Sequence, residues 1–339
     1  MGVKLSKMVG NAQLLRRISD DIDNNTLSHA YIIEGPEGSG RHTLAKSIAA
    51  ALSCLDTASA PCETCKNCKK IFGDGSPDII MQGLEGDKVT IGVESIRKIK
   101  EDMVIAPNEL DVKVYVIENA DVMTVQAQNA FLLSLEEPPK YVMFFLICES
   151  SNALLETIRS RAPILRLERL EDEEVEQYIL RHDNRARQLK DEDPKAFNTV
   201  VFASNGCIGK AISLLDIAKR KALFDERETA ERILSILSCP NRTEVLDIIA
   251  SLGKKRNDVA RYLVSVQHAV RDLILLKKSD TASLCFFPDR EEALELSTRY
   301  TSASLMSLYN ALCTACDELD ANSNVRLTLL GMAQRAGLI

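Results

Sequence analysis

Short apolar runs alternate with helical patterns through the first half of the chain. Residues 113–118 and 142–148 are almost continuously apolar, as expected for parallel strands that are buried on both faces. The stretches between the runs carry apolar residues at helical spacing. This alternation predicts an α/β domain, a parallel sheet with helices on both faces. The expected strands are 30–34, 78–82, 113–118, 142–148 and 163–167, and the expected helices are 44–55, 94–103 and 124–135.

The pattern changes after Leu167, beyond which we find helical segments and no convincing strand. Residues 181–195 are polar and charged with a proline near their end, which predicts a connection or an exposed helix end. We therefore expect three domains: the α/β domain over residues 1–167, a small helical domain over 168–215, and an all-α bundle over 216–339.

Composition places the chain among ordinary globular proteins, since 45% of its residues are hydrophobic and 27% are charged. Its 42 basic and 49 acidic residues give a net charge of −7, which argues against a simple basic DNA-coating protein. The longest apolar run, residues 141–148, is shorter than the roughly 18 residues that a membrane span needs. The N-terminus does not resemble a secretory signal. We expect a cytoplasmic protein with no membrane partner.

A glycine-rich loop follows the first expected strand and leads into a helix. Its frame G-x-x-x-x-G is that of a phosphate-binding P-loop, in which backbone N–H groups cradle phosphates at a helix N-terminus. The P-loop lysine is replaced by arginine, and the Mg²⁺-binding Ser/Thr by histidine, with a threonine one residue too late. Arginine is a planar fork rather than a point charge, and imidazole is a poor Mg²⁺ ligand. The candidate nucleotide-binding residues are Gly35, Gly38, Gly40, Arg41, His42 and Thr43.

The third expected strand ends in Glu118 and Asn119, where an ATPase carries an Asp for Mg²⁺ and then a Glu that activates water. Asn119 cannot act as a base. An active ATPase would therefore need three independent compensations. The sequence favours a P-loop that is retained as a folded scaffold, with weak or absent ATP binding.

Four of the ten cysteines cluster within fifteen residues, in an insertion at about 54–68 that we expect to be a loop. In a reducing compartment clustered cysteines favour metal binding over disulfides. Two successive C-x-x-C steps allow four thiolates to reach one tetrahedral Zn²⁺ and leave no open position, as in a structural site. Redox-active thiols, a chance cluster and an iron–sulfur cluster are the alternatives, whereas Cys313 and Cys316 are expected to be buried small residues. The candidate metal ligands are Cys54, Cys62, Cys65 and Cys68.

These features, in this order, resemble the AAA+ subunits of the bacterial DNA polymerase III clamp loader. The resemblance rests on the P-loop and cysteine cluster, and on the segments Ser28-His29-Ala30-Tyr31, 129–139 (NAFLLSLEEPP), 150–152 (SSN) and 158–161 (IRSR). It covers the first domain closely. It implies an AAA+ P-loop domain, a lid for the small helical domain and an oligomerising collar for the C-terminal bundle.

Within that family the motor subunits keep Lys-Thr in the P-loop and Asp-Glu on the third strand, and this chain departs at all four positions. Gly209 stands where the motor subunits carry an Arg that senses the γ-phosphate. The chain is therefore similar to the non-hydrolysing member of the ring. Ser160-Arg161 matches the family's Ser-Arg-Cys motif, with Ala162 in third place, which implies that Arg161 is an arginine finger acting in a neighbouring subunit.

The resemblance further implies a heteropentameric ring in which the partners are ATPase motor subunits and the delta subunit, with the sliding clamp and primed DNA reached through the complex. Two alternatives stay open. One is a motor subunit of the same complex, with Arg41 substituting for lysine. The other is a zinc-dependent nucleic-acid-binding module, although the sequence lacks a stripe of interleaved basic and aromatic residues.

Overall fold

The computed structural model describes residues 3, 5–84, 86, 88–238, 241–252, 255–279 and 281–339. Its contacts divide the chain into two compact units, which we describe separately. The first unit comprises Met1–Tyr178 with Gly206–Lys210, and the second comprises Ile179–Asn205 with Ala211–Ile339. The three-domain division at residues 167 and 215 stays a prediction.

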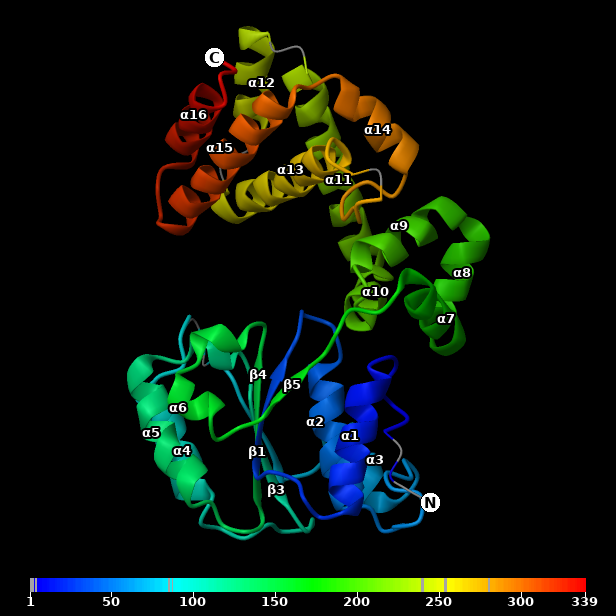
Figure 1. The fold of residues 1–339 in the computed structure, drawn as a ribbon, viewed down its shortest axis with the longest axis vertical. Helices are drawn as coiled ribbons and strands as arrows, with labels where there is room; N and C mark the ends of the chain where they lie inside the picture. Colours follow the sequence, from blue (N-terminus) through cyan, green and yellow to red (C-terminus); the bar gives the residue numbers. More distant parts are fainter. Residues whose placement is uncertain are drawn as a thin grey trace. The chain divides into compact units, whose positions relative to one another are not determined.

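The first unit is built on a sheet of five parallel strands in the order β2-β3-β4-β1-β5. Figure 1 shows helices on both sides of this sheet. Every residue of the central strands β3 and β4 is buried, as their apolar runs predicted. The α/β fold class is thereby confirmed, and the expected strand ends agree to within one residue. The strands are β1 (Ala30–Glu34), β2 (Ile79–Gln82), β3 (Lys113–Ile117), β4 (Val142–Cys148) and β5 (Ile164–Arg166).

Helices cover both faces of this sheet because successive strand residues point to opposite sides. Ile33 belongs to the core under α1–α3, whereas its neighbour Ile32 belongs to the core under α4–α6. In the latter core the rings of Phe131 and Phe144 meet edge to face, 5.1 Å apart. The helices are α1 (Ala12–Asp23), α2 (Arg41–Leu52), α3 (Lys66–Phe72), α4 (Val93–Asp102), α5 (Val125–Glu136) and α6 (Glu156–Arg159), with 3₁₀ turns η1 (Ala120–Val122) and η2 (Ser151–Ala153).

After β5 the described residues form helices and no further strand, as predicted. The sequence predicts that residues 181–195 are a connection or an exposed helix end. Residues 181–182 are the exposed end of α7, but the expected connection is wrong, because α8 occupies most of the segment. The Asp183 carboxylate caps α8 by accepting the N–H of Arg185 at 2.9 Å, and Pro194 opens α9 at a position where proline fits a helix. The helices are α7 (Asp172–His182), α8 (Asn184–Glu192), α9 (Pro194–Ser204), α10 (Ile208–Leu214), α11 (Ile217–Ser238), α12 (Arg242–Ser251), α13 (Arg256–Leu276), α14 (Arg290–Thr298), α15 (Ser302–Asp320) and α16 (Val325–Arg335).

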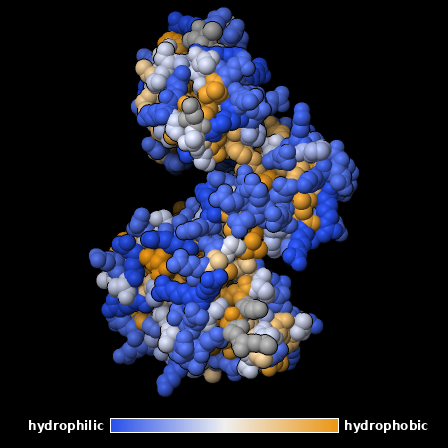
Figure 2. Space-filling view, turned by 45° about the vertical axis from the view of Figure 1, so that its right-hand side comes forward, coloured by the Kyte–Doolittle hydropathy of each residue, from blue (hydrophilic) through white to orange (hydrophobic). Residues whose placement is uncertain are grey.

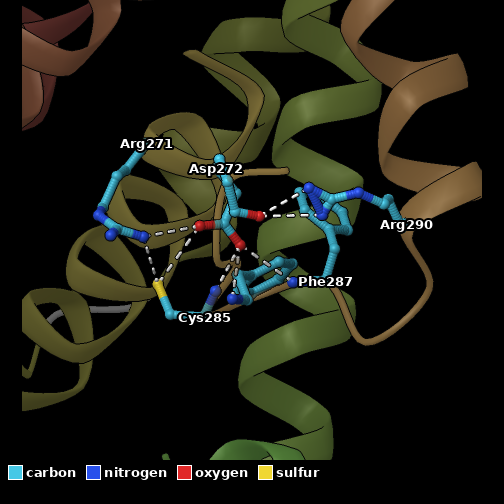
Figure 3. A network of polar contacts seen from close by, with 7 residues as sticks. Arg271, Asp272, Cys285, Phe287 and Arg290 are labelled. Carbon is cyan, nitrogen blue, oxygen red and sulfur yellow. Dashed lines mark hydrogen bonds and ion pairs between the residues drawn. The ribbon is translucent and has the colours of Figure 1, made fainter. Parts of the chain in front are cut away.

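A buried carboxylate organises the C-terminal bundle of the second unit (Figure 3). Asp272 of α13 is fully buried and accepts the backbone N–H groups of Cys285, Phe286 and Phe287 at 2.9, 2.7 and 3.3 Å. The loop before α14 is thus fixed, and the ring of Phe286 lies 4.6 Å from the guanidinium of Arg227. This contact ties the loop to α11.

Polar side chains cover most of the surface seen in Figure 2, where apolar residues gather only in small groups. Among the residues that the structure describes, no helix combines the length and the apolar character that crossing a membrane requires.

Asp78 makes a similar anchor in the first unit, and it generates a test of the fold. It is fully buried, and its carboxylate accepts the N–H groups of Asn108, Glu109 and Leu110 at 2.7, 2.7 and 2.9 Å. Burial alone would raise the pKa of Asp78, but these three hydrogen bonds hold it below its ordinary value.

We expect Asp78→Ala to lower the free energy of unfolding by about 2–4 kcal/mol, because it leaves buried amides without an acceptor. Because the pKa of Asp78 is lower in the folded protein than in the unfolded chain, the difference in free energy of unfolding between wild type and variant should have its full size above about pH 4. It should shrink as the pH falls below the unfolded pKa. Urea unfolding of both proteins between pH 3 and 7 measures it. Asp111→Ala, which removes an exposed carboxylate nearby, should change stability by less than about 0.5 kcal/mol.

Candidate functional site

The glycine-rich loop joins β1 to α2, so the predicted strand–loop–helix context is present. Gly38 and Gly40 have φ values of +78° and +96°, a left-handed conformation that glycine adopts without steric cost. Helix α2 begins at Arg41, which is 8% exposed, and His42 and Thr43 follow in its first turn. The loop therefore has the fold of a phosphate cradle.

The first turn of α10 lies against this cradle. The N–H of Gly209 donates to the carbonyl of Gly38 at 2.9 Å. A Cβ on Gly209 would lie 2.9 Å from the Gly38 Cα, and one on Gly38 would lie 2.6 Å from the Lys210 nitrogen. Both distances are shorter than side chains tolerate, so the contact requires glycine at both positions. The close contact with Gly38 thus gives a steric reason for glycine at position 209, in addition to the resemblance, in which Gly209 stands in the place of an Arg of the motor subunits.

A side-chain pair joins the two positions where an ATPase would hold Mg²⁺. His42 Nε2 lies 2.8 Å from Glu118 Oε1, and both side chains are partly exposed. Sequence reasoning treated these residues as two separate losses and missed the pair between them. The sequence did contain a signal for this pair. An imidazole and a carboxylate stand at two positions that both bind Mg²⁺ in an ATPase, so their side chains are expected to be close in space.

Asn119, in the position of the catalytic glutamate, has a φ of +51° and precedes η1. Asparagine tolerates this left-handed conformation better than most residues.

The four clustered cysteines come together after α2. Their sulfur atoms all lie within 4.8 Å of one another, and those of Cys54 and Cys68 are 3.7 Å apart. Tetrahedral zinc with Zn–S bonds of about 2.3 Å separates its sulfurs by roughly 3.8 Å. The donor set therefore fits a metal ion of this kind. The segment is not entirely a loop, because Cys65 is the N-cap of α3 and Cys68 lies within that helix.

Backbone amides point at the sulfurs and favour their charged form. The N–H of Cys62 donates to Cys54 Sγ at 3.3 Å, and the N–H of Cys65 donates to Cys62 Sγ at 3.3 Å. The Thr64 hydroxyl and the amides of Cys65 and Thr64 lower the pKa of the Cys62 thiol to about 6. Burial instead raises the pKa of Cys54 and of Cys68. A thiolate is the form that binds a metal.

The N-terminal arm, residues 5–8, connects the cysteine cluster with the P-loop, which sequence reasoning did not anticipate. Ser6 Oγ donates to Glu63 at 2.5 Å, and Lys7 Nζ lies 3.3 Å from the same carboxylate. A Cβ on Gly40 would lie 3.4 Å from Met8 Cε, so the Met8 side chain covers this glycine. The arm therefore contacts both candidate sites within four consecutive residues.

Arg161 follows α6, and its side chain is 37% exposed. The backbone N–H of Arg161 donates to the carbonyl of Ile158 at 3.0 Å. Its guanidinium donates to Glu136 Oε1 at 2.7 Å and to the carbonyl of Thr157 at 3.0 Å. The predicted finger therefore has a defined position at the surface of the first unit, beside the buried residues Ile158 and Ala162.

Comparison with known proteins relates the first unit to subunits of DNA polymerase III. Residues 10–171 match the family described as DNA polymerase III, delta subunit. The subunit delta' of DNA polymerase III from Bacillus subtilis (strain 168) is 34% identical over 171 residues, which are 50% of this chain and 51% of that protein. Residues 10–171 are therefore similar to the corresponding part of DNA polymerase III delta and delta' subunits.

Relatives of other kinds also align with this chain. The tau subunit from the same bacterium is 26% identical over 291 residues, covering 81% of this chain and 50% of that protein. A solved structure described as a DNA polymerase III gamma subunit-related protein from Thermotoga maritima is 17% identical, covers 95% of this chain and 99% of that chain, and has a TM-score of 0.47. The chain spans about half the length of the curated relatives it matches.

The contact between Gly38 and Gly209 gives a test that is local to the first unit. We expect Gly38→Ala to lower the free energy of unfolding by about 1–3 kcal/mol, because the new methyl group would meet the Lys210 nitrogen. Hydrogen exchange of the Gly209 amide should accelerate together with this loss.

Gly337→Ala is the matched control, since Gly337 has a φ of +72° but no atom within 4 Å of an added Cβ. It should show only the conformational strain, about 1–2 kcal/mol, with unchanged exchange at Gly209. Equal exchange rates in wild type and Gly38→Ala would contradict the close contact.

Proposed function

We propose that this chain is the delta-prime-type subunit of a DNA polymerase III clamp loader, which works in the cytoplasm in DNA replication and does not hydrolyse ATP itself. The observation that carries the proposal is the His42–Glu118 pair at 2.8 Å. The two side chains that should meet Mg²⁺ meet each other instead. Asn119 replaces the catalytic base, and α10 lies on the cradle through Gly209.

Under this proposal, Arg161 is the residue of this chain that takes a direct part in ATP hydrolysis. It would reach the ATP site of a neighbouring motor subunit, where a planar guanidinium stabilises the charge on the transferring phosphoryl group. The partners are the motor subunits and the delta subunit of the loader, in a heteropentameric ring. Through this ring the chain takes part in placing the sliding clamp on primed DNA.

The motor-subunit alternative has one observation in its favour, since the tau relative aligns with a larger share of this chain than the delta' relative does. The alignment to tau has the lower identity, and four positions of the site lack the residues that a motor needs. We therefore favour the non-hydrolysing role.

We also propose that Cys54, Cys62, Cys65 and Cys68 hold one structural Zn²⁺. Bound zinc would cross-link a segment with few apolar residues of its own. Four thiolates leave no position for water or substrate, so the metal has no catalytic part.

Elemental analysis should find about one Zn²⁺ per chain. Cys65→Ser should release the metal and loosen residues 54–68 while the sheet stays folded, because one thiolate of four is lost. Cys316→Ser, in α15, should keep its metal and serves as the control. A preparation without zinc, or with iron in its place, would overturn the assignment.

The isolated chain should show no ATP turnover above background and weak or absent MgATP binding. Arg41→Lys alone should restore neither, since Asn119 still cannot act as a base and His42 still lacks a hydroxyl for Mg²⁺. A coupled phosphate-release assay measures turnover, and calorimetry measures binding. Turnover of about 1 s⁻¹ or more in wild type would favour the motor alternative.

Arg161→Ala should fold normally and, in a complex reconstituted with the motor subunits, lower ATP turnover and reduce clamp loading further. At the one site that faces this chain, the loss should be about 10³-fold or more. Total turnover falls only in part, because other sites receive fingers from other subunits. Arg161→Lys should rescue incompletely, since a point charge lacks the planar fork.

Arg159→Ala is the control for a nearby surface arginine and should be close to wild type. If Arg161→Ala leaves both turnover and loading unchanged, the finger assignment fails.

A further inference from the structure

The guanidinium of Arg161 is held from two elements of its own domain. Nη2 donates to Glu136 Oε1 at 2.7 Å, while Nη1 donates to the Thr157 carbonyl at 3.0 Å and lies 3.5 Å from Ser160 Oγ. Glu136 is the last residue of α5, and Thr157 belongs to α6. The side chain is therefore fixed on two sides rather than extended freely into solvent.

The two elements are themselves fixed relative to each other. Phe131 and Leu135 anchor α5 in the core of the sheet, at 0% and 1% exposure. Gln128 of α5 accepts the N–H of Leu155, which precedes α6, at 2.7 Å. Glu136 therefore projects from a rigid support, and its carboxylate marks one position for the guanidinium.

Electrostatics favours the same position. Glu136 stands at the C-terminal end of α5, where the unpaired carbonyls of a helix carry partial negative charge and attract cations. The guanidinium has five N–H donors in one plane, and the three contacts leave others free for phosphate oxygens. Both side chains are partly exposed, at 37% and 45%. An exposed ion pair of this kind adds little to the stability of the fold. The effect of the Glu136–Arg161 pair that matters here is therefore that it places the guanidinium.

We propose that Glu136 is a positioning residue for Arg161: it holds the guanidinium in place before a neighbouring subunit presents its ATP. The inference rests on the proposed function, because it concerns the same finger. A guanidinium that is already held in its working geometry stabilises the transition state without the entropic cost of first being ordered. Glu136 acts through Arg161 and touches no substrate itself.

The test uses the complex reconstituted with the motor subunits, clamp and primed DNA. The turnover that Arg161→Ala removes defines the finger-dependent part. Glu136→Ala should lower this part about three- to ten-fold in kcat and leave the KM for ATP unchanged. Glu136→Gln, whose amide oxygen still accepts a hydrogen bond, should keep most of it. Glu137→Ala removes the same charge one residue further along and should match wild type.

A double variant separates positioning from a structural effect. On the Arg161→Ala background, Glu136→Ala should cause no further loss, because the two residues act as one unit. An equal loss on both backgrounds, an unchanged kcat in Glu136→Ala, or a rise in kcat would each overturn the positioning role while the finger stands. If Arg161→Ala itself has no effect, the proposed function fails first.

Discussion

The backbone hydrogen bond from Gly209 to Gly38 is the constraint on which the candidate nucleotide site depends. It exists only because neither residue carries a Cβ, and it brings the first turn of α10 against the glycine-rich loop. In the same site the side chains of His42 and Glu118 are hydrogen-bonded to each other.

The cysteine cluster and the P-loop belong to one hydrophobic core rather than to two separate modules. Cys54 and Cys68 pack with Leu44 and Ile48 of α2, the helix that follows the P-loop. The same face includes Leu5 of the N-terminal arm. A metal at the cysteines would therefore stabilise the region that carries the cradle, in addition to its own segment.

The sequence predicted the sheet well because buried parallel strands leave continuous apolar runs, as in residues 113–118 and 142–148. The sequence also predicted that the four cysteines cluster, because they lie within fifteen residues of one another. It did not predict α8, whose few apolar residues give a weak pattern and whose start depends on the Asp183 cap. Nor did it predict the pairs His42–Glu118 and Glu136–Arg161, which join residues 76 and 25 positions apart. Such pairs depend on how elements pack, and no local pattern encodes that.

The N-terminal arm has a practical consequence for how this domain is studied. Ser6, Lys7 and Met8 precede α1, and a shortened chain that begins at this helix would keep every strand and every cysteine. It would nevertheless lose the partner of Glu63 beside the cysteines and the side chain that covers Gly40. Such a fragment would present the Gly40 part of the loop without its Met8 contact. Affinities for this domain are therefore comparable only between proteins that retain the arm.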